Sequence, residues 1–395
     1  MLVFGNRAHF STIGGVENSI RSLLKVASEE NIPSLLVCRE AIDNESLDTG
    51  ALSLPVNVEL MTYRDDHDSP LLRRLYSLHM GGENLSKLYS EIYVDHPDSI
   101  VVVRQQLHVL AAKSAGFTDI RYLVPSIAVN QLREEFLGAS LIRRLKIIAH
   151  MIVQGFSQRR ALRIAKVFVF SRSMNRQVRK LLPKELKNKS IRIVKPGVDA
   201  TRFNVAAGKE KASLRKQLNL PIKQNLFLFV GRFVQAKGLD YAIDAIATMP
   251  DDCTLILVGE GEHETSVREK IKKLKLDTKV ILAGSTSRVE DYYRACDVFV
   301  MSSTYEPLGQ TILEAASTGM RLVAFHPNSG VITATNELEL DYAIDYANEL
   351  TSASLANAMS QSLLAISNQG AKNISLQTQK LYSWSALLHH LQATE

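Results

Sequence analysis

Two glutamates, Glu306 and Glu314, stand eight residues apart in the stretch TYEPLGQTILEA, with a proline and a glycine between them. An apolar, strand-like run precedes the stretch, and the spacing after Gly309 predicts a helix that begins at Gln310. That helix N-terminus would present backbone N–H groups to an anion such as phosphate. Glu306 could accept hydrogen bonds from sugar hydroxyls, and Glu314 could reach a diol. This order of groups fits a nucleotide sugar; the alternative is that Glu314 is an ordinary helix residue.

A second candidate group consists of two cations in one turn. Arg232 and Lys237 are five residues apart and follow the strand-like run 225–230, and Gly238 ends the turn. Two cations suit a diphosphate because they neutralise its charge, and a guanidinium can bind it through two hydrogen bonds. An isolated pair of this kind more often belongs to a solvated turn. Its assignment to a diphosphate site therefore depends on the presence of the two glutamates.

Such groups need a scaffold that brings the ends of several strands together. Helical stretches alternate with continuous apolar runs, which are typical of strands buried on both faces of a parallel sheet. In the second half of the chain these runs lie at 225–232, 253–261, 279–284, 297–303 and 321–327. The alternation occurs in both halves and predicts an α/β fold with two doubly wound sheets. Ligands bind at the carboxyl ends of such strands, so the turns there should converge on one site.

Length and composition fit two soluble domains. The chain has 395 residues, of which 46% are hydrophobic and 22% charged, and one core of that size is unusual. Proline and glycine at 195–203 follow a strand-like run, which predicts a boundary between residues 1–195 and 196–375.

Cysteine usage and hydropathy indicate a cytoplasmic protein. Cys38, Cys253 and Cys296 are widely spaced within apolar runs, which favours buried thiols in a reducing compartment over a disulfide framework or a metal cluster. No segment approaches 18 uninterrupted apolar residues, and the N-terminus lacks the pattern of a secretory signal. We therefore expect neither a membrane span nor secretion.

Several segments together resemble glycosyltransferase family 4, whose members are retaining enzymes with the GT-B fold. The resemblance is carried by VGRFVQAKGLDYAIDAI, LILVGEGE, AGSTSRVEDYYRACDVFVMSSTYEPLGQTILEAASTG and KPGVDATRF, by GGVE at 14–17 and by YSWSALLHHL near the C-terminus. The E-x7-E element is specific when it occurs with the R-x4-K element. The resemblance implies two Rossmann-like domains that face each other across a cleft. It also implies a final helix, 376–395, that packs back toward the N-terminal domain.

The resemblance assigns roles to the candidate residues. Arg232 and Lys237 would bind the donor diphosphate and stabilise the leaving group. Glu306, the third catalytic candidate, would contact the donor sugar, and Glu314 would contact the ribose. The other implied donor-binding positions lie in turns and at helix starts: Gly15, Gly259, Gly284, Ser285, Leu308, Gly309 and Gln310. No cofactor is expected, because the nucleotide sugar is itself a substrate, and the resemblance implies transfer without a metal.

Two positions depart from the family's pattern. Many members have a histidine after an N-terminal strand, where this chain has Pro125 and Ser126. His108 and His9 are therefore the candidates on the acceptor side, although a lone histidine in an apolar helix is more often structural. The usual double glycine followed by glutamate reads NSGV at 328–331, which bears on the identity of the donor sugar.

The basic charge is concentrated late in the first half. Residues 131–195 hold 17 basic and 3 acidic residues, which suggests an anionic partner for the basic region 133–195. The segment 140–154 is amphipathic and could rest on an anionic membrane surface; the alternative is a solvated helix whose apolar side packs on the sheet. Nucleic acid is disfavoured, because no aromatic stacking platform accompanies the charge.

We predict a cytoplasmic retaining glycosyltransferase, and the basic region allows a peripheral position on the inner face of the cell membrane. It would move a sugar from a UDP- or GDP-sugar to a glycan or lipid-linked acceptor in cell-surface polysaccharide or lipopolysaccharide biosynthesis. Two other classes stay open. One is a non-catalytic sugar-nucleotide-binding partner of another transferase, and the other is a different GT-B enzyme such as a sugar-nucleotide epimerase.

Overall fold

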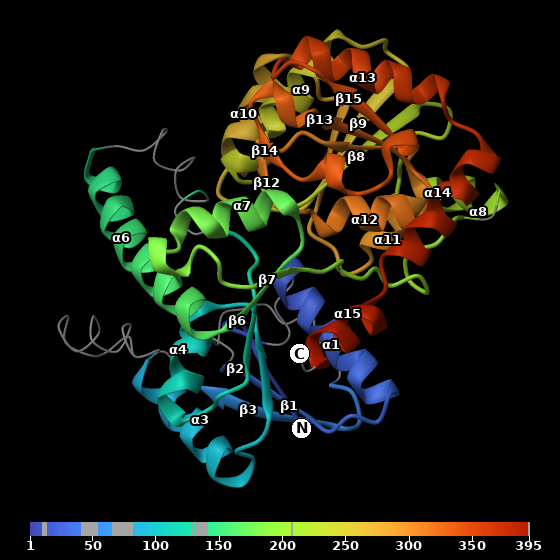
Figure 1. Ribbon diagram of the computed structural model, residues 1–395. Helices are drawn as coiled ribbons and strands as arrows, with labels where there is room; N and C mark the ends of the chain where they lie inside the picture. The colour runs from blue at the N-terminus through green and yellow to red at the C-terminus, as the bar shows by residue number, and fades with distance from the viewer. Residues whose placement is uncertain are drawn as a thin grey trace. The chain divides into compact units, whose positions relative to one another are not determined.

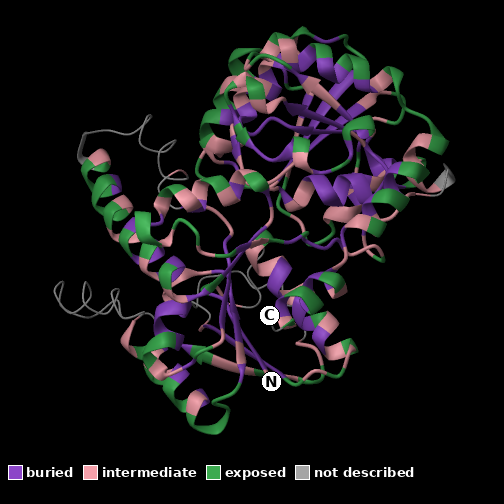
Figure 2. Ribbon diagram, viewed as in Figure 1, coloured by how far each residue is buried: buried purple, intermediate pink, exposed green. Residues whose placement is uncertain are grey.

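The computed structural model describes residues 1–9, 14–40, 54–64, 82–127, 130, 141–206 and 208–393, with the side chains of 141, 142, 208 and 209 excepted. The chain forms two compact units (Figure 1). Unit 1 comprises Met1–Gly197 and Trp384–Glu395, and unit 2 comprises Val198–Ser383. In each unit the strands are mostly buried, whereas the helices turn one face to solvent (Figure 2).

The segment predicted as one final helix, 376–395, is divided between the units. Helix α14 (Asn368–Leu381) packs on α12 (Gln310–Ser317) and belongs to unit 2. Helix α15 (Trp384–Gln392) packs on α1 (Gly15–Glu29) and belongs to unit 1. The break at Tyr382 and Ser383 is where the chain passes from one unit to the other.

Unit 1 contains a seven-stranded, all-parallel sheet with the order β3-β2-β1-β4-β5-β6-β7. This is the strand order of a Rossmann fold with one strand added at an edge. Its strands are β1 (Leu2–Gly5), β2 (Ser34–Arg39), β3 (Val58–Tyr63), β4 (Ile100–Val103), β5 (Ile120–Leu123), β6 (Lys166–Val169) and β7 (Ile191–Ile193). Besides α1 and α15, its described helices are α3 (Glu83–Asp95), α4 (Gln106–Ala115), α6 (Leu141–Ile164), α7 (Arg172–Leu181) and the short η1 (Lys184–Leu186).

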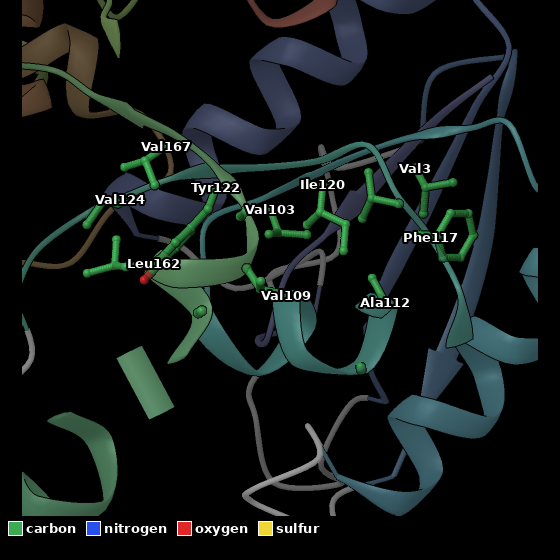
Figure 3. Packing of buried hydrophobic residues seen from close by; sticks show 14 of the residues in the cluster. Val3, Val103, Val109, Ala112, Phe117, Ile120, Tyr122, Val124, Leu162 and Val167 are labelled. Carbon is green, nitrogen blue, oxygen red and sulfur yellow. The ribbon is translucent and has the colours of Figure 1, made fainter. Parts of the chain in front are cut away.

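Each face of this sheet is covered by helices, which explains the continuous apolar runs of its strands. On one face, Val109 and Ala112 of α4 lie beneath the strands, and Leu162 of α6 lies beside Tyr122 (Figure 3). On the other face, apolar residues of α1 and α15 form a second core with β1, β2 and β6: Phe4, Ile20, Leu23, Leu24, Leu36, Phe168, Leu387, Leu388 and Leu391.

Unit 2 repeats this architecture with a six-stranded parallel sheet in the order β10-β9-β8-β11-β13-β15. Its strands are β8 (Asn225–Val230), β9 (Cys253–Val258), β10 (Val280–Gly284), β11 (Val298–Met301), β13 (Arg321–Phe325) and β15 (Ile344–Ala347). Its helices are α8 (Gly208–Gln217), α9 (Leu239–Thr248), α10 (Glu264–Lys273), α11 (Val289–Ala295), α12, α13 (Ser352–Leu364) and α14. A separate two-stranded sheet joins β12 (Tyr305–Glu306) to β14 (Ile332–Thr333).

Arg121 of β5 fastens α15 to unit 1. Its side chain is fully buried and donates hydrogen bonds to the carboxylate of Asp119 at 2.9 and 2.7 Å. The same guanidinium donates to the backbone carbonyl oxygens of Leu391 and Ala393 at the end of α15. Trp384, at the start of α15, is 7% exposed and lies so close to Gly197 that no side chain would fit at that glycine.

Replacing Arg121 by methionine should destabilise unit 1 and release α15. The substitution leaves two carbonyl groups unpaired and removes the Arg121 cation from the partly buried Asp119 carboxylate, which keeps only the half-exposed Lys166 ammonium at 3.2 Å. We therefore expect the free energy of unfolding to fall by about 3 kcal/mol. Trp384 is the only tryptophan, so its fluorescence during urea unfolding reports on this unit. The matched control is Arg64→Met, which breaks the exposed ion pair with Glu40 and should change stability little. Equal losses in the two variants would contradict the anchoring role of Arg121.

Candidate functional site

The candidate site lies in unit 2, at the carboxyl edge of its sheet, where the loops after β8, β9, β11 and β13 meet. Two of these loops are joined by the short parallel pair β12 and β14, in which Tyr305 is opposite Ile332 and Glu306 is opposite Thr333. The Ile332 N–H also donates to the carbonyl oxygen of Thr304 at 2.8 Å. The backbone around Glu306 is therefore held in a fixed register.

The turn that carries Arg232 and Lys237 is fastened to the loop after β11. The Thr304 N–H donates to the Ala236 carbonyl oxygen at 2.9 Å, and the Ser302 hydroxyl donates to the Lys237 carbonyl oxygen at 2.9 Å. Gly238 has a φ of 63°, and a Cβ placed there would lie 2.1 Å from the Ser302 carbonyl oxygen. Only glycine allows this approach without moving one backbone away from the other.

This arrangement brings two of the three catalytic candidates into contact. The Lys237 ammonium donates a hydrogen bond to the Glu306 carboxylate, and the two side chains are only 21% and 12% exposed. The third candidate, Arg232, follows the same strand but is exposed. Within the described part of the chain, its guanidinium pairs with no carboxylate. One cation is thus held by an acid, and the other is available to an anion.

Glu306 lies across the start of α12. A Cβ added at Gly309 would lie 3.2 Å from the Glu306 Cδ, so the glycine leaves room for the glutamate side chain. Gly309 is the N-cap of α12, where no side chain caps the helix, and Gln310 is its first residue. Glu306, Leu308, Gly309 and Thr335 line a crevice here that is too narrow to hold a water molecule. The N-terminus of α12 and a paired carboxylate therefore lie next to each other.

Glu314 lies in a different environment. Its side chain is 7% exposed, and the hydroxyl of buried Tyr293 donates to its Oε2 at 2.9 Å. Burial raises the pKa of Glu314 to about 7, and the Tyr293 hydrogen bond and the charge of Arg202 offset part of that rise. The two glutamates of the predicted pair thus have different partners. Glu306 accepts a hydrogen bond from a cation, whereas Glu314 is bound by a neutral hydroxyl and loses its charge as pH falls through about 7.

The glycines after β9 and β10 have separate roles. Gly259 has a φ of 135°, and a Cβ there would lie 2.0 Å from the Gly231 carbonyl oxygen. Its N–H donates to the Gly284 carbonyl oxygen at 2.8 Å. Gly259 therefore holds the loops together, whereas Gly284 and Ser285 are exposed, with open space at Gly284.

The remaining sequence-predicted residues lie in unit 1. Gly15 begins α1, is exposed and has open space around it. His9 is half-buried. His108 is fully buried, with its Nδ1 3.0 Å from the Tyr89 hydroxyl and its Nε2 3.5 Å from the Tyr63 hydroxyl. Burial, with a smaller contribution from the charge of Arg7, lowers the pKa of His108 to about 3, so this imidazole is a neutral core group.

Arg104 is a residue that the sequence analysis missed. It directly follows β4, at the carboxyl edge of the unit 1 sheet, and is 6% exposed. Its guanidinium donates to the Ser19 hydroxyl of α1 and lies 5.2 Å from the centre of the Phe170 ring. Burial lowers the pKa of Arg104 to about 10. In the sequence, an arginine that directly follows the strand-like run IVVV could have indicated this residue.

Metal-ligating residues do not cluster in the described part of the chain, where no group of three or more histidine, cysteine, aspartate or glutamate side chains could hold an ion. Cys38, Cys253 and Cys296 are buried thiols. The polar groups of the site in unit 2 are therefore the cations, the carboxylates and the start of α12 described above.

Two Rossmann-like units with these strand orders define the GT-B fold. The full chain is similar to the structure of sucrose-phosphate synthase from Thermosynechococcus elongatus, with a TM-score of 0.76 and 18% identity over 99% of this chain and 96% of that chain. It is also similar to Anabaena Alr3699/HepE in complex with UDP-glucose, with a TM-score of 0.72 and 18% identity over 99% and 97% of the two chains.

Sequence similarity is concentrated in unit 2. Residues 210–362 match the family described as glycosyl transferases group 1. One relative, the lipopolysaccharide core biosynthesis glycosyltransferase LpsE of Rhizobium meliloti, is 35% identical over 117 residues, which are 30% of this chain and 34% of the relative. The matched part spans about a third of the length of the curated relatives. All the candidate residues from Arg232 to Glu314 fall within the matched region.

The environment of Glu314 makes the stability of unit 2 depend on pH. Its pKa in the folded protein is about 7 against an ordinary value of 4.5, so the folded state binds the proton more tightly than the unfolded state. Stability contributed by the protonated group is present below pH 4.5 and is lost as pH rises to about 7. Glu314→Gln should therefore match wild type at pH 5 and exceed it by up to about 3 kcal/mol at pH 8.

Urea unfolding followed by circular dichroism at both pH values measures this difference. The control Glu349→Gln removes the same charge from an exposed position. A gap between wild type and Glu314→Gln that is equal at pH 5 and pH 8 would show that Glu314 keeps an ordinary pKa.

Proposed function

We propose that this protein is a retaining glycosyltransferase that uses a nucleotide-sugar donor. The observation that carries the proposal is the contact of Lys237 with Glu306 beside the N-terminus of α12, with Arg232 exposed in the same turn. This set of groups lies in the region that matches the glycosyl transferases group 1. The UDP-glucose complex of the structural neighbour supports a nucleotide-sugar donor, with UDP or GDP as the nucleotide.

In the proposed complex, the donor diphosphate lies between Arg232, Lys237 and the N–H groups at the start of α12. Lys237 has two proposed partners. Without donor its ammonium pairs with Glu306, and with donor bound it also donates a hydrogen bond to the phosphates. Glu306 then accepts hydrogen bonds from the donor sugar. Glu314 uses the carboxylate oxygen that does not bind Tyr293 to accept from the ribose hydroxyls. The remaining proposed contacts are the turns at Gly259, Gly284 and Ser285, and Gly15 of unit 1.

The proposed reaction breaks the bond between the anomeric carbon and the diphosphate oxygen and forms a bond from that carbon to an acceptor oxygen on the same face. The acceptor proton passes to the departing phosphate oxygen. Negative charge develops on the diphosphate as the bond breaks, and fixed cations and helix N–H groups stabilise it without reorganising. We propose that no metal takes part.

The proposed acceptor is a glycan or a lipid-linked saccharide of cell-surface polysaccharide or lipopolysaccharide. The support is the LpsE relative, whose name places it in lipopolysaccharide core biosynthesis. Transfer to such an acceptor is proposed to occur in the cytoplasm or on the inner face of the cell membrane.

Loss of either cation should reduce transfer far more than it reduces stability. We expect Arg232→Met and Lys237→Met each to lower kcat/KM by about a hundredfold or more, because each removes charge stabilisation from the leaving group. Glu306→Gln should cause a similar loss. Lys272→Met, which removes an exposed cation from α10, is the matched control and should retain wild-type activity.

The assay combines calorimetry of UDP- and GDP-sugars with release of the nucleoside diphosphate in the presence of lipid-linked saccharide acceptors. Nuclear magnetic resonance of the product shows whether the anomeric configuration is retained. Donor binding without turnover on any acceptor would instead indicate a non-catalytic sugar-nucleotide-binding protein. If no donor binds, the assignment of the site in unit 2 is wrong.

A further inference from the structure

Helix α6 turns its apolar side to solvent. Leu145, Ile148, Ile152 and Phe156 are 64%, 41%, 67% and 58% exposed. Their spacing of three, four and four residues places all four on one face of the helix. The sequence analysis allowed for an apolar side packed on the sheet, and the structure shows the reverse. Much of the outer surface of α6 is exposed in Figure 2.

The opposite side of α6 holds the helix in place. Leu162 packs beside Tyr122 in the core of unit 1 (Figure 3). The Gln158 amide donates to the Ser126 carbonyl oxygen at 2.8 Å and to the Tyr122 hydroxyl at 3.3 Å. A rotation that buried the apolar stripe would break these hydrogen bonds and expose Leu162. The outward stripe is therefore set by the fold.

The charges of α6 are of one sign. Between residues 141 and 164 the chain has six basic residues and no acidic residue. Arg143, Lys146 and His150 are exposed on the side of the helix opposite the stripe. Arg159 and Arg163 are exposed and continue the stripe beyond Phe156. The helix thus combines an apolar stripe with cations on its opposite side and at its end.

We propose that α6 docks unit 1 onto the surface of an anionic lipid bilayer. The apolar stripe would enter the interface between headgroups and acyl chains, and the basic side chains would contact the anionic headgroups. Among the described residues, no helix is both long enough and apolar enough to cross a bilayer, so the proposed contact is a surface contact. A second copy of the chain is a poorer occupant, because it would bring a second set of cations against the first.

This proposal stands independently of the proposed glycosyl transfer, because it uses neither the residues nor the unit of the candidate site. It assigns to the membrane surface a specific element, α6, rather than the whole basic region 133–195. The part of that region before residue 141 lies outside the described residues.

The test is sedimentation of the full chain with large unilamellar vesicles at about 0.1 M salt, where charge interactions act over about 10 Å. One vesicle is pure phosphatidylcholine, and the other contains phosphatidylglycerol as well. Wild type should sediment with the anionic vesicle only. The variant Ile152→Ser with Phe156→Ser should bind at least tenfold more weakly. The variant Arg159→Gln with Arg163→Gln should bind about 25-fold more weakly, since each basic residue near the surface contributes about a fivefold factor.

The matched control is Leu364→Ser with Leu376→Ser, which removes two side chains that are 89% and 66% exposed in unit 2. It should bind as wild type does. An unchanged Trp384 fluorescence and urea midpoint in every variant confirms that unit 1 remains folded.

Three results would overturn the proposal. Wild type could fail to sediment with either vesicle, or the two α6 variants could bind anionic vesicles as tightly as wild type. A concentration-dependent dimer that disappears in the Ile152→Ser, Phe156→Ser variant would assign the stripe to self-association instead. Light scattering of wild type and this variant over a range of concentrations detects that outcome.

Discussion

The close approach of two backbones at Gly238 and Ser302 is the constraint on which the site depends. It places the turn after β8 against the loop after β11, and the hydrogen bond between Thr304 and Ala236 maintains that contact. Because these strands are neighbours in the sheet, the loops need no long insertion to meet. Lys237 and Glu306, which are distant in sequence, become ion-paired side chains only through this contact. The backbone contact between the two loops therefore determines where the charged side chains of the site lie.

The two glutamates show how one helix can hold two different acids. Glu306 precedes the first turn of α12, and its carboxylate accepts a hydrogen bond from the Lys237 ammonium. Glu314 is further along the helix and is buried against Tyr293, a neutral hydrogen-bond donor. A hydroxyl compensates less than an ammonium for the loss of water. The same residue type is therefore ion-paired at one position and, with a pKa of about 7, is about half protonated near neutral pH at the other.

The sequence predicted the two doubly wound sheets because continuous apolar runs leave few alternatives to buried parallel strands. It also placed Arg232, Lys237 and Glu306 after strands of one sheet. It could not predict the contact between Lys237 and Glu306, which depends on the close approach of Gly238 to Ser302. Nor could periodicity show that the final segment changes unit at Ser383, or that His108 has tyrosines on both ring nitrogens. These features depend on contacts between distant parts of the chain.

Helix α6 shows why periodicity alone does not reveal what an apolar face contacts. The pattern of Leu145, Ile148 and Ile152 identifies a face, but folding requires only that enough of the helix be fixed, and Leu162 and Gln158 do this from the other side. Burying apolar surface contributes roughly 25 cal/mol per Å², and the exposed part of the stripe contributes none of this free energy to the folding of unit 1. That free energy remains available for association. Every charged residue of α6 is basic. An anionic lipid bilayer, with an apolar interior and negatively charged headgroups, can therefore bind the helix through both the apolar and the electrostatic contribution.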